Sequence, residues 1–291
     1  MNTPIKQAQQ IFEQVQQAWS NAFTDSPWHT EVIHPKPNYI NRIMTLEQHP
    51  VFEKAGIACS TLAGSHLPEA ASKRHPECVN QPFEVTGISL VFHPQNPFAP
   101  SVHANLRFFS SGTTWWFGGG MDLTPYYPTI EHCKHWHHTI QKACERLEPT
   151  CYHTFKQACD DYFFLKHRGE MRGIGGIFFD DLNNHPQDQL LNWMTDLGQT
   201  FIDAYGPIID VTKDQTFTPH HRVFQQHRRT RYAEFNLLYD RGTLFGLQFG
   251  GRIESILMSM PPTTGWRYQL SPDISADEAH LATFLQPQCW V

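Results

Sequence analysis

The sequence predicts an α+β fold, because strand patterns and helix patterns occupy separate stretches of one chain. Residues 85–93 are rich in β-branched and apolar side chains, and residues 102–109 alternate between apolar and polar positions. Apolar residues recur at three- and four-residue steps in 5–23, 130–147 and 190–205, which is the period of an amphipathic helix. With 291 residues and 40% hydrophobic content, the chain can form the core of one large domain or two small ones.

Composition excludes several classes of protein. A formal net charge of −6 gives no electrostatic basis for binding nucleic acid. The seven cysteines are odd in number and form no CxxC pair, which favours reduced thiols over a disulfide framework or a zinc ribbon. No apolar run is long enough for a transmembrane segment, and the N-terminus lacks the pattern of a signal peptide. We therefore expect a cytoplasmic protein without a nucleic-acid partner.

The N-terminal half is expected to contain one helix, a loop-rich stretch and a small sheet. Residues 25–81, with frequent Pro, Asn and His, favour loops after the first helix. The strands at 85–93 and 102–109 are expected to form a hairpin, and 113–117 suits a third strand. The glycines at 118–120 then favour a tight turn, after which 121–125 should leave the sheet.

The predicted hairpin has one polar face. Strand side chains alternate, so His103, Asn105 and Arg107 share the face opposite Val102, Ala104, Leu106 and Phe108. Ser89 and His93 likewise share a face of the preceding strand. Arginine presents a planar fork to carboxylates, and histidine titrates near neutral pH. We interpret this face as a functional site. The alternative is the solvated face of a half-buried strand, although such faces usually carry Lys, Glu and Thr.

Two further helices are predicted after the sheet. In 130–147, His137 falls in the apolar stripe, where a histidine is most often a hydrogen-bonded core residue. In 151–168, the last turn carries His167 between two cations, which complement the negative end of the helix dipole. A glycine-rich turn should lead from there into a strand at 177–181.

The C-terminal third is predicted to return to strands. The basic segment 220–231 is interpreted as a helix surface near an anionic substrate rather than as a nucleic-acid patch. Residues 232–239 and 244–249 alternate like strands, joined by a compact turn at 240–243. The pattern of 253–260 leaves helix and strand open. Ser275 and Glu278 have the spacing of a capping box that opens the last helix.

The arginines indicate the kind of ligand. Arg107, Arg241 and Arg252 lie near glycine-rich bends and, with Arg172, predict an anionic ligand, most readily a polycarboxylate. The sequence contains no HExxH motif, no two-His-one-carboxylate pattern and no nicotinamide or flavin fingerprint. From its residues alone, the chain is expected to be an α+β enzyme with a His/Arg/Asp pocket for a carboxylated substrate.

Several long motifs also resemble those of a known family. GISLVFHPQNPFAPSVHANLRFF, WWFGGGMDLTP and EFNLLYDRGTLFGLQFGGRIESILMSMPP are similar to the signatures of aerobic (oxygen-dependent) coproporphyrinogen III oxidases of haem biosynthesis. The resemblance covers 51–291. It implies a single domain over 1–291, with a large central antiparallel sheet flanked by helices on both faces and a homodimer through about 232–266. Residues 1–50 diverge, and 36–50 lack the family's glycine-rich segment.

The resemblance further implies a reaction. Two propionates of coproporphyrinogen III would be oxidatively decarboxylated to vinyls, giving protoporphyrinogen IX, carbon dioxide and hydrogen peroxide. Dioxygen would be the co-substrate, with no organic cofactor. A divalent metal has been attributed to some bacterial members, but a redox role for it is not expected.

The resemblance also implies the site residues. The implied catalytic residues are His103, Asp240, Asp122 and Arg107. The implied substrate-binding residues are Ser89, Asn105, Leu106, Arg107, Arg241, Gly250, Gly251 and Arg252. The implied pocket or metal histidines are His93, His103, His137 and His167, which we expect to line a cleft without coordinating a transition metal. A His-rich metal-dependent hydrolase or lyase and a non-catalytic tetrapyrrole carrier remain as alternatives.

Overall fold

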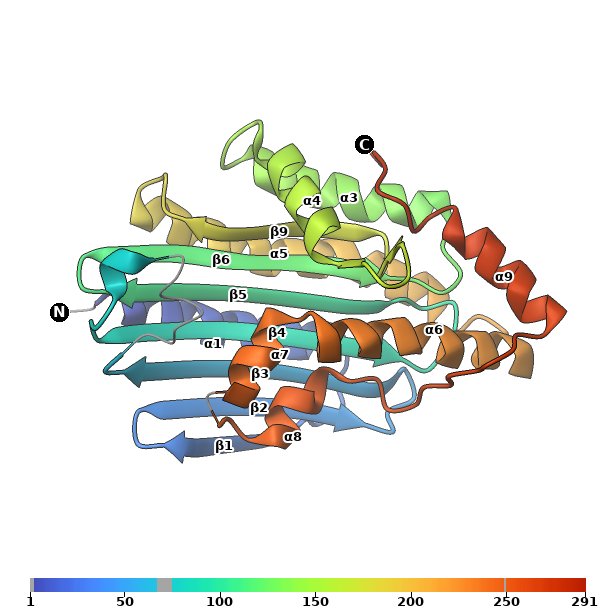
Figure 1. Cartoon of the computed structure of the whole chain (residues 1–291), viewed down its shortest axis with the longest axis horizontal. Coiled ribbons are helices and arrows are strands. Elements are labelled where there is room, and N and C mark those ends of the chain that lie inside the picture. Colours follow the sequence, from blue (N-terminus) through green and yellow to red (C-terminus); the bar gives the residue numbers. More distant parts are fainter. Residues whose placement is uncertain (1–2, 67–74, 249) are drawn as a thin grey trace.

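A computed structural model describes residues 3–66, 75–248 and 250–291. Its centre is a seven-stranded antiparallel sheet of order β1-β2-β3-β4-β5-β6-β9 (Figure 1). The first six strands follow one another as a meander, and β9 joins the edge at β6. The strands are β1 (His29–Lys36), β2 (Tyr39–Glu47), β3 (Phe52–Gly64), β4 (Phe83–Pro94), β5 (Ser101–Ser111), β6 (Thr114–Thr124) and β9 (Gly175–Leu182). A separate short hairpin pairs β7 (Phe164–Leu165) with β8 (Glu170–Met171).

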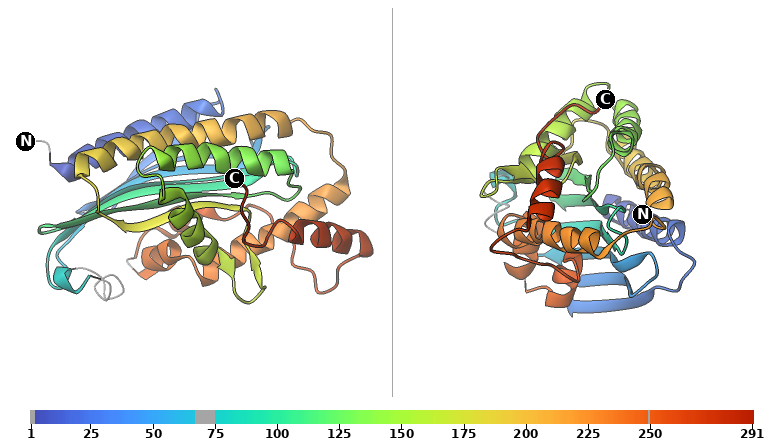
Figure 2. Two further views of the ribbon diagram at one scale, coloured as in Figure 1. Left: turned by 90° about the horizontal axis from the view of Figure 1, so that it is seen from above. Right: turned by 90° about the vertical axis from the view of Figure 1, so that its right-hand side faces the viewer.

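Helices cover both faces of the sheet. Figure 2 shows α1, α5 and α3 on one side of it and α6, α7 and α9 on the other. The helices are α1 (Pro4–Ala22), α3 (Ile130–Glu145), α4 (Cys151–Tyr162), α5 (Gln187–Thr212), α6 (Pro219–Leu238), α7 (Arg241–Gln248), α8 (Ile253–Ile256) and α9 (Pro272–Ala282). The predicted α+β fold, with a large antiparallel sheet between helices, is confirmed.

The main core lies between the sheet and α1, α3 and α5. The predicted apolar stripe of α1, which includes Phe12 and Trp19, is buried there, and the Trp19 indole donates to the Gly198 carbonyl at 2.8 Å. Leu106 and Phe108 of β5 point into the same core and are 1% exposed or less. Burial of each such large apolar side chain contributes roughly 1.5–3 kcal/mol. The opposite face of β5 is therefore the one left for polar residues.

The prediction of loops over 25–81 was wrong, because this stretch holds β1, β2 and β3. β1 is an edge strand and exposes every second residue, so proline and polar side chains are tolerated there. In β2 the apolar side chains of Ile43 and Leu46 are buried, while most of their neighbours stay polar. The glycine-free residues 36–50 include the whole of β2.

The helix predicted over 151–168 ends earlier, at Tyr162, and the chain turns into the β7–β8 hairpin. Phe163 and Leu165 are buried in a second apolar cluster with Phe235 and Leu285. This long-range packing, which a helical period does not reveal, ends the helix.

The predicted strands at 232–239 and 244–249 are helices α6 and α7, and residue 249 lies outside the described part of the chain. The alternation there was misleading, because Phe235 is buried whereas Leu237 is 49% exposed. Residues 253–259 form α8 and a short 3-10 turn.

The last helix does not use the predicted capping box. Ser271, and not Ser275, stands at the N-cap position of α9, and Glu278 instead accepts a hydrogen bond from Arg228. In the described ranges no helix is long and apolar enough to cross a membrane.

Candidate active site

The polar face of β5 is the centre of the candidate site. Cross-strand register places His103 opposite Asp122, Asn105 opposite Gly120 and Arg107 opposite Gly118. Side chains of directly opposed residues point to the same face of a sheet. The three polar side chains of β5 are partly buried on the face opposite the main core. The predicted division of this strand into two faces is confirmed.

A buried ion pair supports His103. Its Nδ1 lies 2.9 Å from Oδ1 of Asp122, and the Arg172 guanidinium donates to both oxygens of the same carboxylate at 2.7–2.8 Å. Burial alone would raise the pKa of Asp122, but Arg172 and His103 outweigh it and hold this pKa below its ordinary value. An ionised carboxylate only accepts, so Nδ1 of His103 carries the proton and Nε2 is directed toward Asn105, 3.5 Å away.

Arg172 does not face a ligand, contrary to the sequence-based prediction. The side chain is buried, and its guanidinium lies 4.3 Å from the ring centres of both Phe163 and Tyr232. Another of its nitrogens donates to Asn236 of α6 at 2.9 Å. This arginine therefore binds an internal carboxylate and links β6 to α6.

Asp240 caps α7 at the edge of the same region. It accepts from the Thr243 amide at 2.8 Å, from the Thr243 hydroxyl at 2.7 Å and from the Tyr162 hydroxyl at 2.9 Å. Burial opposes ionisation of Asp240, but these donors and the nearby His103 lower its pKa below the ordinary value. The segment 240–243 is thus the start of a helix and not the predicted hairpin turn.

Two arginines meet at one carboxylate of β9. Arg107 donates to Oδ1 of Asp180 at 2.8 Å, and Nη1 of Arg241 lies 3.4 Å from Oδ2. The guanidinium of Arg241 also lies 4.9 Å from the ring centre of Tyr162. Arg107 and Arg241 keep 32% and 49% of their side-chain surface exposed. This pair, unlike Arg172, is accessible to an anionic ligand.

Gly118 explains how Arg107 reaches across the sheet. A Cβ atom at Gly118 would lie 2.6 Å from Nε of Arg107, so the absent side chain leaves room for the arginine to cross β6 toward β9. A Cβ at Gly120 would lie 2.4 Å from the Ile177 carbonyl oxygen. The prediction of a turn at 118–120 was wrong, because β6 continues to Thr124. These glycines instead let atoms of the neighbouring strands lie close to β6.

The other predicted substrate-binding residues lie apart from this pair of arginines. Gly250 has a positive φ of 66°, and Arg252 donates to Glu31 of β1, at the far edge of the sheet. The Leu106 side chain lies in the main core. Ser89 is the exception, because it lies opposite Asn105 in the β4–β5 register and therefore shares the polar face.

The four predicted histidines do not form one metal site. His93 donates from Nε2 to the Ser259 carbonyl at 2.9 Å, and its Nδ1 accepts from the Ser101 hydroxyl at 2.9 Å. Burial lowers the pKa of His93 well below its ordinary value. Both ring nitrogens of His93 are therefore already used.

His137 and His167 are also fully paired. His137 lies 3.0 Å from both the Tyr152 hydroxyl and the Ile174 carbonyl, and burial lowers its pKa to about 3. The ring nitrogens of His167 lie 2.8 Å from the Tyr239 hydroxyl and 2.7 Å from Glu234. Residues 3–66, 75–248 and 250–291 contain one group with metal-ligand spacing, and it includes none of the four histidines. These residues do not fit a shared ion.

The basic stretch of α6 is largely internal. Arg228 is buried and donates to Glu170 and Glu278, and Arg229 is buried and donates to Glu53. The interpretation of this stretch as a surface near a substrate was wrong for both arginines, since they join α6 to β8, α9 and β3.

Two polar residues of the site escaped sequence reasoning. Asp180 follows an apolar run and resembles an ordinary strand end, and Tyr162 occupies a position in a helical stripe. The acidic pair 180–181 was the available signal, since it follows the apolar run 177–179 and borders the loop at 183–186, and functional residues are often found on such connecting segments.

Comparison with known proteins identifies similar chains. A family model described as coproporphyrinogen III oxidase matches residues 1–290. The "Oxygen-dependent coproporphyrinogen-III oxidase" of Coxiella burnetii (strain Dugway 5J108-111) is 49% identical over 268 residues, which is 90% of this chain and 86% of the relative. The protein of that name from Francisella tularensis subsp. novicida (strain U112) is 48% identical over 253 residues, 85% of this chain and 82% of the relative. That from Francisella tularensis subsp. tularensis (strain SCHU S4 / Schu 4) is 44% identical over 291 residues, covering 97% and 94%.

Proposed function

This chain belongs to the coproporphyrinogen III oxidase family, and we propose that it catalyses the oxygen-dependent oxidative decarboxylation of coproporphyrinogen III in haem biosynthesis. In each step one propionate, one dioxygen and one proton give a vinyl group, carbon dioxide and hydrogen peroxide. Two steps give protoporphyrinogen IX. The observation that best supports this function is the pair of accessible arginines, Arg107 and Arg241, beside His103 and Asp240.

The arginines are proposed to hold the reacting propionate. Arg107 and Arg241 already converge on the carboxylate of Asp180, so the geometry that binds one carboxylate is preformed. Asn105 accepts from Arg107 at 3.4 Å and orients it. Ser89, opposite Asn105, is proposed to line the same surface.

The glycine-rich segment after α7 is proposed to contact the far side of a large tetrapyrrole. Gly250, Gly251 and Arg252 lie near β1, four strands from β5, which corresponds to about 19 Å at the usual strand spacing. Leu106 is proposed to contribute through its backbone, since its side chain belongs to the core.

Asp240 is the carboxylate that we propose to assist the pyrrole. Its lowered pKa keeps it ionised at neutral pH, and a carboxylate beside a pyrrole N–H increases the electron density of the ring. Oxidation by dioxygen removes electrons from that ring system, so this interaction strengthens as the reaction proceeds. Loss of carbon dioxide from the propionate then leaves the vinyl group.

His103 is proposed to transfer the proton. With Nδ1–H directed at Asp122, its Nε2 is available to take a proton and give it to the reduced oxygen. Asp122 is buried against Arg172 and is therefore proposed to act through His103, as a positioning residue, instead of touching the substrate. His93, His137 and His167 are proposed to have structural hydrogen-bonding roles.

The oligomeric state is proposed to be a homodimer through about 232–266. Large apolar side chains are exposed in this stretch, where water would otherwise cover them. They are Leu237, Leu238, Leu244, Leu247, Ile253 and Trp266. Light scattering should give twice the chain mass at micromolar concentration, and a monomer there would contradict the proposal.

Two coarser proposals complete the assignment. Residues 1–291 are proposed to act as one domain, because the strands of the divergent N-terminal part pair within the central sheet. A cytoplasmic location is proposed because all seven cysteines are free and six are buried.

The function is tested by incubating the purified full-length protein with coproporphyrinogen III under air and under argon. Dioxygen uptake, carbon dioxide release and hydrogen peroxide should match the vinyl groups formed one to one. The Arg146→Ala variant, in which an exposed arginine at the end of α3 is removed, serves as a control that keeps activity. Equal turnover under argon would refute the oxidase, and tight product binding without dioxygen uptake would indicate a carrier.

A further inference from the structure

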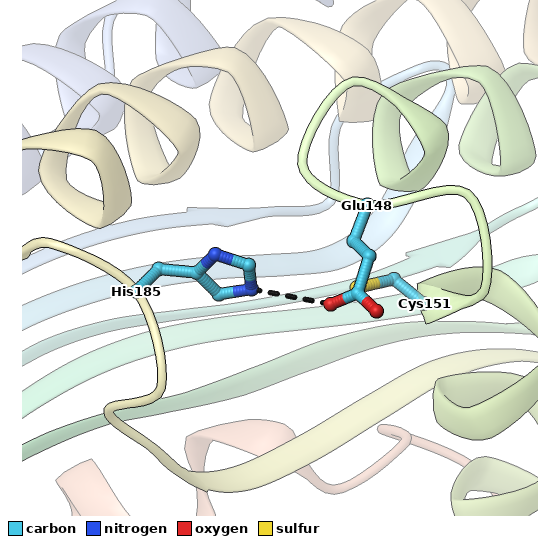
Figure 3. A group of neighbouring side chains, drawn as sticks. All are labelled: Glu148, Cys151 and His185. Carbon is cyan, nitrogen blue, oxygen red and sulfur yellow. Dashed lines mark ion pairs between the residues drawn. The ribbon is translucent and has the colours of Figure 1, made fainter.

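Three side chains with different metal-binding atoms meet at the corner between α3 and α4, as Figure 3 shows. Glu148 lies in the connection between these helices, Cys151 opens α4, and His185 lies between β9 and α5. A carboxylate oxygen, the thiol sulfur and an imidazole nitrogen all lie within 4.8 Å of one another. This corner cluster uses none of the residues assigned to the active site.

The orientation of these groups is typical of ligands. Nε2 of His185 is buried without a hydrogen-bond partner among the described residues and lies 3.4 Å from Oε2 of Glu148. Two ligands at the usual zinc distances stand about 3.3–3.4 Å apart on the edge of a tetrahedron. Thr150 donates to Oε1 of Glu148 at 3.0 Å, which leaves Oε2 facing the imidazole. An ion pair accounts for the short distance between Glu148 and His185, but it does not account for the buried Cys151 thiol beside them.

We propose that Glu148, Cys151 and His185 form a zinc site that clamps the α3–α4 corner to the turn between β9 and α5. The donor set selects the metal, because calcium and magnesium prefer oxygen ligands whereas zinc accepts sulfur, nitrogen and oxygen together. The group contains three side chains, so water completes the tetrahedron. Zinc binding would displace the proton of the Cys151 thiol, because the thiolate is the form that coordinates a metal.

The clamp is separate from the oxidation chemistry. Cys151 and Tyr162 are the two ends of α4, about 16 Å apart along the helix axis. β9 ends at Leu182, after Asp180 and before His185, so a bound ion fixes the connection that follows the strand carrying Asp180. The proposal does not rest on the oxidase function.

Cobalt(II) tests the site directly. The chelator-treated full-length protein is titrated with Co²⁺, and we expect a near-ultraviolet thiolate-to-cobalt band and tetrahedral d–d bands that saturate at one ion per chain and disappear on adding Zn²⁺. Cys151→Ser and His185→Gln should abolish these bands, whereas Cys289→Ser, which changes an exposed cysteine, should keep them. Glu148→Gln should weaken cobalt binding by at least about tenfold, because mutating even a residue that only hydrogen-bonds a metal ligand costs about that much affinity.

Thermal unfolding provides a second readout. Saturating zinc should raise the Tm of the chelator-treated protein by several degrees, and it should leave Cys151→Ser unchanged. Absence of the cobalt bands in the wild type, or their persistence in Cys151→Ser, would overturn the proposal. Turnover that rises in proportion to the zinc bound would overturn the assignment of this site as a structural clamp. A protein that shows the bands but no oxidase activity would refute only the proposed function.

Discussion

Replacing Gly118 with alanine should impair catalysis while leaving the fold intact. The added Cβ would lie 2.6 Å from Nε, 2.7 Å from Nη2 and 2.9 Å from Cζ of Arg107. Ordinary contacts between such atoms are about 3.5–4.0 Å, so the guanidinium must withdraw by roughly 1 Å. Its 2.8 Å hydrogen bond to Asp180 would then be broken, and a propionate held in the same way would lose its partner.

The magnitude follows from that lost contact. A charge-assisted hydrogen bond contributes about 1.5–3 kcal/mol, which corresponds to a loss of roughly 10- to 150-fold in kcat/KM. Stability should change little, because partly exposed ion pairs such as Arg107–Asp180 contribute less than about 1 kcal/mol. The assay compares the initial rate of vinyl formation from coproporphyrinogen III with the Tm of each variant.

Two other glycines supply matched controls. Gly120→Ala places its Cβ 2.4 Å from the Ile177 carbonyl oxygen, which cannot move without disturbing the β6–β9 ladder, so this variant should lose thermal stability. Gly206→Ala in α5 meets no atom outside its own helical turn within 4 Å of the added Cβ, so it should keep wild-type kinetics and gain about 0.5–1 kcal/mol of stability from the helix propensity of alanine. Wild-type kinetics in Gly118→Ala would refute the claim that Arg107 must cross this glycine.

Three further outcomes are expected. Arg107→Ala should lower kcat/KM by roughly 10- to 150-fold at unchanged Tm, because it removes the same carboxylate contact; a lower Tm with normal kinetics would show a purely structural role. Asp180→Asn should lower KM, since Asp180 no longer competes for Arg107, and a raised KM would contradict this competition. Burial alone would raise the pKa of Glu234, but the hydrogen bonds from Arg168 and His167 outweigh it and hold this pKa at about 2, below its ordinary 4.5. The stability that ionised Glu234 contributes is therefore complete above pH 4.5 and is lost as the pH falls toward 2. Glu234→Gln should be less stable than the wild type at pH 7, and this difference in stability should disappear between pH 4.5 and pH 2. A difference in urea-unfolding free energy that does not vary with pH would contradict this assignment.

The polar hairpin was predictable because a strand with one face in the core imposes a period of two on its residues. His103, Asn105 and Arg107 show that period without interruption, so their common face follows from the sequence. The glycines beside them were ambiguous, since glycine permits both a tight turn and the close approach of a neighbouring side chain. Only the path of Arg107 over Gly118 distinguishes the two.

The roles of the arginines were less predictable. Arg107 and Arg172 both lie near glycines in the sequence, yet one is accessible and the other is enclosed by Phe163 and Tyr232. Burial of an arginine is decided by packing between segments far apart in the chain, and no local pattern encodes it. The same limit applies to α6. Phe235 fits the strand-like alternation of Ala233, Phe235, Leu237 and Tyr239 as well as the buried face of a helix, until the partners of that face are known.

The central claim is that side chains on the polar face, and not a metal held by histidines, carry out the proposed oxidation. The most direct test is the turnover of chelator-treated, metal-analysed protein with coproporphyrinogen III, measured beside His103→Ala. We predict that the chelator-treated wild type keeps its turnover, because a pyrrole assisted by Asp240 can supply electrons to dioxygen. The His103→Ala variant should lose activity without losing any bound metal. Turnover that vanishes on chelation and returns in proportion to one added ion would contradict the claim.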